Sequence, residues 1–303
     1  MRSSWKFPPR TILVPLDFSN DSLAGLEAAR LLGERWRCHV EVIHVDQGPP
    51  PAFNQGIDLW TTEALAAMGR DLRHWLERAA APVAHASTHI LTGPPAAIIS
   101  RLAADAAADL VVLSPRRRRR LPRIFSGSLS ETSVHAANAP VLTVRTRPEA
   151  GWPRRVLAPV KWAPYADRSL RAARDWAASL DAELGLLHVF EGGEEDEMER
   201  RAVVEHALNV LGEPSPRVRW HWATGRPFDE IPRAAEAGGY DLVVVAEHVR
   251  DGWKDAVFGT TAERVLRASS VPVLCVPGGP VKARAHRQAD AGIARGYPGL
   301  SGV

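Results

Sequence analysis

Short apolar runs alternate with longer amphipathic segments along the first half of the chain. The runs Thr11–Leu16, Val40–Val45 and Leu110–Leu113 have the length of strands and are dominated by apolar residues, which is typical of strands covered on both faces. Apolar residues three and four positions apart predict helices at Ser22–Arg37, Thr61–Ala81, Pro95–Ala107 and Gly127–Ala137. This alternation predicts parallel strands joined by right-handed crossovers.

The same pattern occurs twice in the chain. The segment TILVPLD resembles RVLAPVK, which places Pro159 144 residues after Pro15. Later equivalent residues, such as Asp109 and Asp241, are 132 apart, so the second copy lacks 12 residues in its middle. We therefore predict two α/β domains at 11–148 and 155–278, with an N-terminal extension, a linker and a tail at 1–10, 149–154 and 279–303.

Composition indicates a globular protein, because 45% of the 303 residues are hydrophobic and 24% are charged. No apolar run is long enough to cross a membrane, and the first residues lack the apolar core of a secretion signal. The two cysteines, Cys38 and Cys275, are too few for a disulfide framework and show no C-x-x-C spacing. We expect a cytoplasmic protein that does not bind membranes.

The net charge of +3 is located in the tail, since residues 279–303 carry four Lys or Arg against one Asp. The rest of the chain sums to zero, so the folded part shows no general attraction for nucleic acid or acidic lipid. The tail is rich in Gly and Ala, and we expect it to be disordered.

Polar residues follow two of the expected strands of the first copy. Asp17 ends the first strand, Ser114 ends the fourth, and the pair Gly127 and Ser128 opens the next helix. A helix start offers backbone N–H groups to a phosphate, while a carboxylate accepts hydrogen bonds from ribose hydroxyls or an amine. This arrangement suits a nucleotide. The alternative is that Asp17 caps the next helix and the Gly-Ser pair is only a turn.

Helix caps are also predicted from the residue types. Asn20 or Asp21 is placed to cap the first helix of the first copy, and Ser128 is placed to cap the last.

The segments ILVPLDFSNDS, VIHV, DLVVLS, FSGSLSE and APVLTV, in this order, resemble a universal stress protein domain. LAPVKWAPYAD, LLHVF, DLVVVAE, VFGTTAE and VPVLCV resemble a second one. The resemblance implies two doubly wound five-stranded parallel-sheet domains in tandem, of the adenine nucleotide alpha hydrolase-like fold with strand order 3-2-1-4-5. It also implies a pseudo-dimer in which the fifth strands, Val141–Val144 and Val273–Val276, pair edge to edge.

Many members of this family bind ATP, with Mg²⁺ as a companion ion, through the pattern G-x-x-G-x9-G-[ST]. Gly127 and Ser128, followed by Leu129, match its end, but Arg117 and Ser114 stand where the two loop glycines are expected. Asp17 and Val45 match the adenosine side. Glycine permits close backbone approach to phosphate, so its loss predicts weak binding.

The second copy departs further from the pattern. Lys161 replaces the aspartate, and Ala246 and Val249 replace the loop glycines, although Gly259 and Thr260 remain. The resemblance therefore implies at most one weak adenine-nucleotide site, in the first copy.

The run Arg116–Arg120 allows two interpretations. The guanidinium groups could bind phosphate in place of the lost backbone contacts, or the run could be a solvated loop extended by charge repulsion. Binding of nucleic acid is disfavoured, because no aromatic residues are interleaved for base stacking.

No catalytic or metal-binding residue is predicted. His44 and His188 occupy equivalent positions and are expected to be hydrogen-bonded structural residues, while His85 and His89 fall on an expected strand, where a spacing of four makes no metal pair. We expect a non-catalytic regulatory or sensor protein of the stress response, with an unidentified protein partner or a homodimer. The alternatives are a scaffold without nucleotide and, less favoured, an ATP-hydrolysing or nucleotidyl-transfer enzyme.

Overall fold

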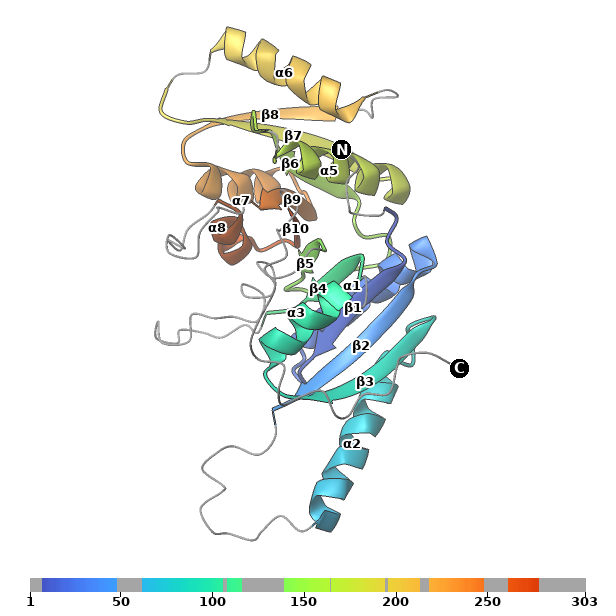
Figure 1. Ribbon diagram of the computed structural model, residues 1–303. Coiled ribbons are helices and arrows are strands. Elements are labelled where there is room, and N and C mark those ends of the chain that lie inside the picture. The colour runs from blue at the N-terminus through green and yellow to red at the C-terminus, as the bar shows by residue number, and fades with distance from the viewer. Residues whose placement is uncertain are drawn as a thin grey trace.

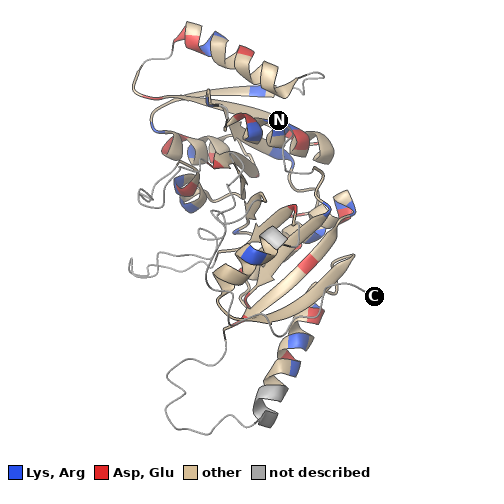
Figure 2. Cartoon of the chain, viewed as in Figure 1, with Lys and Arg blue, Asp and Glu red and all other residues tan. Residues whose placement is uncertain are grey.

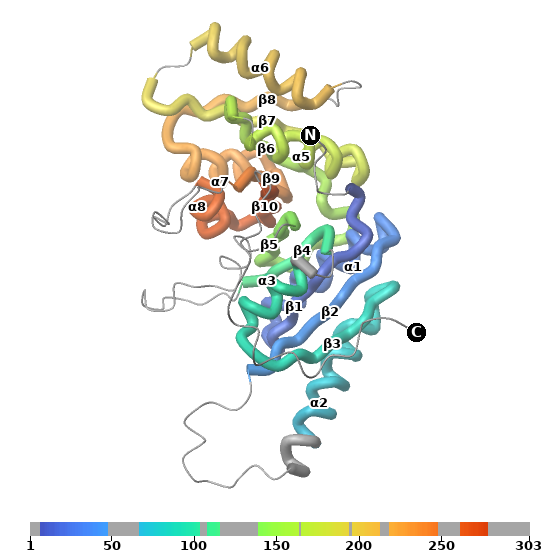
Figure 3. Tube along the Cα trace, viewed as in Figure 1, coloured from blue at the N-terminus to red at the C-terminus, as the bar shows by residue number. Residues whose placement is uncertain are grey.

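In a computed structural model, two α/β units share one continuous sheet (Figures 1 and 3). The structure describes residues 7–47, 62–105, 108–115, 139–163, 165–193, 196–212, 218–247 and 261–277. Each unit corresponds to one copy of the sequence repeat.

The first copy contains the elements β1 (Thr11–Leu16), α1 (Ser22–Trp36), β2 (His39–Asp46), α2 (Thr62–Ala80), β3 (Ala86–Thr92), α3 (Pro95–Asp105), β4 (Leu110–Leu113) and β5 (Val141–Thr143). The second contains β6 (Arg155–Pro159), α5 (Asp167–Leu180), β7 (Glu183–Phe190), α6 (Glu197–Leu211), β8 (Val218–Thr224), α7 (Pro227–Ala237), β9 (Leu242–Glu247), α8 (Thr261–Ala268) and β10 (Val273–Pro277).

The sheet has ten strands in the order β3-β2-β1-β4-β5-β10-β9-β6-β7-β8. Within each copy the strands are parallel and follow the order 3-2-1-4-5, as the sequence predicted. The copies meet where β5 and β10 pair antiparallel, with Leu142 opposite Leu274. The expected pairing of the fifth strands is therefore present, and it merges the two five-stranded sheets into one.

Both faces of the sheet are buried, which explains the apolar strand runs. In β1, Ile12, Val14 and Leu16 face the core covered by α1, α2, α5 and α6, whereas Leu13 faces the core covered by α3, α7 and α8. Charged residues lie mainly on the helices, and the strands are largely free of them (Figure 2). The pattern follows from the pleat, because successive side chains of a strand point to opposite faces.

Aromatic packing between α1 and α5 forms a second contact between the copies. The rings of Trp36 and Trp176 meet edge to face at 4.9 Å, and the Trp36 indole N–H donates to Ser179 Oγ at 3.2 Å. Trp176 is fully buried. In addition, Arg145, just after β5, donates to the carbonyl of Leu266 in α8 at 2.7 Å. The copies thus form an intramolecular pseudo-dimer.

Two local expectations for the first copy are wrong. Asp21 has helical dihedral angles and makes no capping hydrogen bond, and it is Ser19 Oγ that accepts from the backbone N–H of Ser22 at 3.2 Å. A serine before the expected cap positions competes successfully because the turn after β1 brings it over the helix start. His85 precedes β3 and has a φ of 57°, so only His89 belongs to the strand. Ser128 lies outside the described residues.

Both cysteines are buried and free, as expected from their number. Burial raises the pKa of the Cys38 thiol to about 11 and that of Cys275 well above its ordinary value. Among the described residues, no helix has the length and apolar character needed to cross a bilayer.

Candidate functional site

In each copy the strand order reverses at one point, at the carboxyl ends of the parallel strands. In the first copy the chain turns from β1 to β2 on one side and later to β4 on the other, so strand order reverses between β1 and β4. Ligands of open α/β sheets bind at such a reversal. Asp17 follows β1 and Ser114 follows β4, and Val45 lies near the end of the adjacent β2. The fold therefore brings these three predicted residues to the same edge.

Asp17 shapes the turn between β1 and α1. Its Oδ1 accepts from the Ser19 backbone N–H at 3.1 Å and from the Ser19 hydroxyl at 2.5 Å. Ser19 in turn caps α1 at Ser22. Asp17 is half-buried, so its carboxylate supports the helix start and still reaches the surface of the edge. Both interpretations of this residue, as ligand group and as part of a cap, have a structural basis.

Ser114 is held beneath α1. A Cβ added to Gly25 of α1 would lie 2.7 Å from Ser114 Oγ, so the hydroxyl occupies the space that the missing side chain leaves. This oxygen is buried and has no hydrogen-bond partner among the described residues. The hydroxyl is therefore directed into the packing of α1 against β4 and is not offered to a phosphate.

An aromatic cluster beside Asp17 was not anticipated from the sequence. Phe18 packs on His44 of β2, with ring centroids 4.5 Å apart, and on Trp75 of α2, at 4.2 Å. Phe18 remains 43% exposed. The signal in the sequence was an aromatic residue directly after Asp17, but its partner Trp75 is 57 positions away and only the fold brings it near.

Phe18 also has a φ of 62°, in the left-handed region that bulky residues avoid. Such strained residues occur preferentially at functional sites. Val45, in contrast, is buried in the core on the α3 face, opposite the face where His44 meets Phe18. Asp17 and Phe18 thus both present surface at this edge.

His44 and His188 are structural, as predicted. Nδ1 of His44 bonds to the carbonyl oxygen of Leu16 at 2.7 Å, and Nδ1 of His188 bonds to that of Val160 at 3.2 Å. Each ring therefore ties the second strand of its copy to the end of the first.

At the equivalent edge of the second copy, one exposed ion pair and two histidine–carboxylate contacts link described side chains. Lys161, in place of Asp17, lies 3.7 Å from a carboxylate oxygen of Glu191. Nε2 of His188 lies 3.1 Å from a carboxylate oxygen of Glu199. Between α5 and α6, Nε2 of His206 lies 3.0 Å from a carboxylate oxygen of Asp167.

Trp162 stands at the position of Phe18 in the second copy and stacks on His206 at 5.4 Å, but it is not among the residues with positive φ. The aromatic contact is thus repeated while the strained backbone is not. The two edges differ in charge and in conformation.

The remaining predicted site residues, Arg117, Gly127, Ser128 and Leu129, lie outside the described residues, as do Val249, Gly259 and Thr260 of the second copy. Within the parts of the chain that the structure describes, no group of three His, Cys, Asp or Glu side chains is arranged to hold a metal ion.

Both copies of the repeat match a known family. The model of the universal stress protein family matches residues 9–145 and 153–277, once for each copy. The chain belongs to the universal stress protein family. As a tandem member of this family, it is 27% identical over 284 residues to a universal stress protein of Mycolicibacterium smegmatis, covering 88% of this chain and 96% of that protein.

Solved structures show the same fold over nearly the whole universal stress protein tandem. A universal stress protein from Archaeoglobus fulgidus superposes with a TM-score of 0.70 and 20% identity, over 88% of this chain and 96% of the other. A protein from Pseudomonas aeruginosa superposes with a TM-score of 0.62 and 20% identity, over 89% and 94% of the two chains. These identities support the shared fold alone.

Proposed function

We propose that this tandem universal stress protein is a non-catalytic regulator of the stress response that binds one adenine nucleotide weakly, at the β1/β4 edge of its first copy. The observation that carries the proposal is the pair Asp17 and Phe18 at the strand-order reversal, where an acidic group adjoins a half-exposed, strained aromatic residue.

The chemistry of these groups fits a nucleoside. A carboxylate accepts hydrogen bonds from ribose hydroxyls or from the adenine amino group, and an exposed aromatic ring offers a face for a purine. Asp17 already accepts from Ser19, which fixes its carboxylate in one orientation before a ligand arrives. Pre-organisation of this kind lowers the entropic cost of binding.

The weak affinity for nucleotide follows from the residues expected beside the phosphates. Ser114 is turned under α1, so it supplies no phosphate contact, and the backbone donors must come from Gly127 and Ser128. In this proposal Mg²⁺ would accompany the triphosphate and contact its oxygens. The proposal assigns no site in the second copy, because Lys161 and its partner Glu191 occupy the adenosine end.

Binding of ATP to the whole chain, measured by isothermal titration calorimetry, tests the proposal. Asp17→Asn keeps an oxygen for Ser19 and removes the charge, and Phe18→Ala removes the ring. We expect each to weaken ATP binding by about ten-fold, which is the scale of one charge-assisted hydrogen bond for Asp17→Asn and of one stacking contact for Phe18→Ala. The matched controls are Lys161→Ala and Trp162→Ala, at the same positions of the second copy, which should leave affinity unchanged.

A second candidate, a scaffold that has lost nucleotide binding, is favoured by the buried Ser114 hydroxyl and by the engagement of Asp17 in the α1 cap. No heat of binding with ATP, ADP or AMP at millimolar concentration would support this scaffold. Release of phosphate from ATP, dependent on Asp17, would instead contradict the non-catalytic assignment. The partner in this proposal is either a protein that recognises the nucleotide-bound state or a second copy of the chain.

A further inference from the structure

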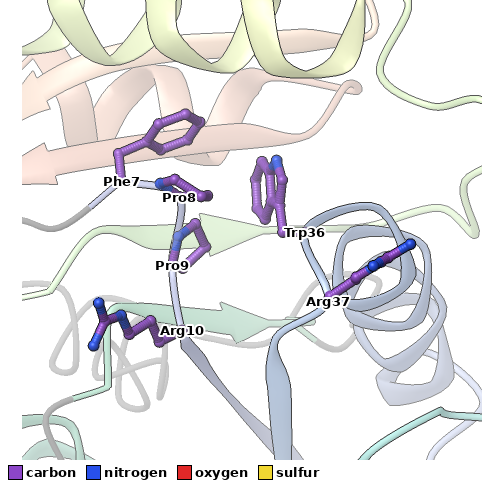
Figure 4. A pocket seen from close by; sticks show the side chains of 6 residues that line it. All are labelled: Phe7, Pro8, Pro9, Arg10, Trp36 and Arg37. Atoms are coloured by element: carbon purple, nitrogen blue, oxygen red, sulfur yellow. The ribbon is translucent and has the colours of Figure 1, made fainter.

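A pocket of about 470 Å³ lies far from the strand-end edge, at the other end of β1. It is lined by Phe7, Pro8, Pro9, Arg10, Trp36 and Arg37 (Figure 4). These residues precede β1 or end α1, whereas Asp17 follows β1. A six-residue strand spans about 20 Å, so this pocket is separate from the proposed nucleotide site.

Trp36 forms the rigid wall of the pocket. Its indole N–H donates to Ser179 Oγ of the second copy at 3.2 Å, and its ring meets Trp176 edge to face. Phe7 packs against the same ring at 5.5 Å and 78°. With the N–H engaged, the indole offers the pocket only aromatic surface, held in place by both copies.

The pocket is also cationic. Arg10 and Arg37 are exposed, and neither guanidinium forms an ion pair with any residue that the structure describes. Figure 4 shows the two side chains on opposite sides of the Trp36 ring, each extending away from it. The carboxylate of Asp109 contacts the backbone of Arg10, whose N–H donates to Asp109 Oδ2 at 2.8 Å. No acidic side chain lines the pocket.

The second copy has different residues at the positions that line this pocket. At the position of Pro8 it has Trp152, which is 8% exposed and donates its indole N–H to the carbonyl of Asp241 at 2.8 Å. At the positions of Trp36 and Arg37 it has Leu180 and Asp181. At these described positions the second copy thus has a buried tryptophan and an aspartate, so it does not repeat the combination of aromatic rings and two arginines that lines the pocket of the first copy.

We propose that this pocket binds a small planar aromatic carboxylate. The Trp36 and Phe7 rings would contact the aromatic part, and the exposed Arg10 and Arg37 side chains, which extend away from the ring in the free protein, would turn toward the carboxylate. Guanidinium groups bind carboxylates through paired hydrogen bonds and also stack on aromatic rings. A cavity of about 150 Å³ holds benzene, so the volume here suffices for two fused rings with a carboxylate.

The test uses 2-naphthoate as the probe and calorimetry on the full-length protein. Two further probes separate the contributions: 2-naphthamide lacks the charge, and decahydro-2-naphthoate lacks the aromatic rings. We expect saturable binding of naphthoate and about ten-fold weaker binding of each of the other two. Equal binding of all three, or no saturable binding of naphthoate up to several millimolar, would overturn the proposal.

The protein side is tested with the double variant Arg10→Gln and Arg37→Gln. Both side chains are exposed and unpaired among the described residues, so folding should be unaffected. Naphthoate affinity should fall by at least about ten-fold. Arg154→Gln, at the position of Arg10 in the second copy, is the matched control and should bind naphthoate like the parent. Unchanged affinity in the double variant would refute the site.

The location is tested by NMR of the indole N–H signals. Trp36→Leu introduces the residue found at the equivalent position of the second copy and identifies the Trp36 signal by its loss. We expect naphthoate to shift this signal in the parent protein, and perturbation confined to other indoles would refute the location. Asp17→Asn should leave naphthoate binding intact, which separates this result from the fate of the nucleotide proposal.

Discussion

Leu142 of β5 and Leu274 of β10 lie opposite each other at the antiparallel junction of the two copies. The residues are 132 positions apart and occupy the same place in the repeat, so a pseudo-twofold axis passes between them. Both side chains are fully buried and belong to the same core. A single hydrophobic core thus crosses from one copy to the other, and we expect each copy to depend on its neighbour for stability.

The Leu142 and Leu274 side chains should therefore be energetically coupled. Each Leu→Ala change is expected to lower the free energy of unfolding by about 2–5 kcal/mol, as for other buried leucines. The double variant should differ from the sum by about 0.5–3 kcal/mol, as for residues in contact. Urea unfolding measures all three. Leu13→Ala with Leu274→Ala is the control pair, on opposite cores, and should be additive; additivity at the junction would argue against coupling.

The contact between Gly25 and Ser114 predicts that Gly25→Ala changes the stability of the protein in opposite directions in two backgrounds. Gly25→Ala alone places a Cβ 2.7 Å from Ser114 Oγ and should destabilise the protein by about 1–3 kcal/mol through overpacking. In a Ser114→Gly background the clash is gone, and the same Gly25→Ala change should stabilise by about 1 kcal/mol, because alanine is the better helix former. Thermal unfolding of the parent, the two single variants and the double variant measures these changes in stability. Destabilisation of equal size in both backgrounds would show that the two sites do not touch.

The arginine run can be tested by restoring a glycine of the family pattern. If the loop is a backbone cradle that the side chain obstructs, Arg117→Gly should tighten ATP binding, and we expect this outcome. If the guanidinium groups grip the phosphates, the variant should bind more weakly by about 1 kcal/mol or more. Calorimetry at two salt concentrations separates these, because exposed charge contacts are screened over about 8 Å at physiological ionic strength.

His221 of β8 predicts a loss of stability in acid. Its Nε2 lies 2.5 Å from Tyr240 Oη, and burial lowers the pKa of the imidazole while it raises that of the phenol. A lowered folded-state pKa means that the unfolded chain binds the proton more tightly. The histidine therefore contributes stability above the unfolded pKa of about 6.5, and this contribution is lost as the pH falls through the folded value.

The measurement is urea unfolding of the parent and of His221→Gln at pH 8 and pH 5.5. The parent should lose more stability than the variant over this range, by at most about 1.4 kcal/mol per pH unit. His39→Gln, at an exposed position, is the control and should follow the parent. A parallel loss in the parent and in His221→Gln would assign the acid sensitivity to other groups.

Helix positions could be predicted because they depend on local patterns, and the strand order 3-2-1-4-5 could be predicted because the resemblance to the family implied it. The continuous apolar run of β1 signals burial on both faces, and the predicted helix Ser22–Arg37 ends one residue beyond α1 (Ser22–Trp36). The cap of α1 was missed, because several polar residues after β1 could serve and only the geometry of the turn selects Ser19.

For the candidate site, the sequence placed Asp17, Val45 and Ser114 at the ends of neighbouring strands, and the sheet brings them to one edge. It did not show that Ser114 is turned beneath α1, nor that Phe18 contacts Trp75. Both depend on how closely a helix packs on the sheet, and the amino-acid sequence does not specify that distance directly.

The sequence by itself determined the repeat, the fold of each copy and the charge difference between Asp17 and Lys161, because periodicity and residue type are properties of the chain. Only the tertiary structure decided which side chains meet: Trp36 with Trp176 across the copies, Phe7 with Trp36 at the pocket, and Trp152 with the carbonyl of Asp241 in the second copy. Such contacts join residues far apart in sequence, and packing of the whole molecule, with no local propensity to guide it, selects among them.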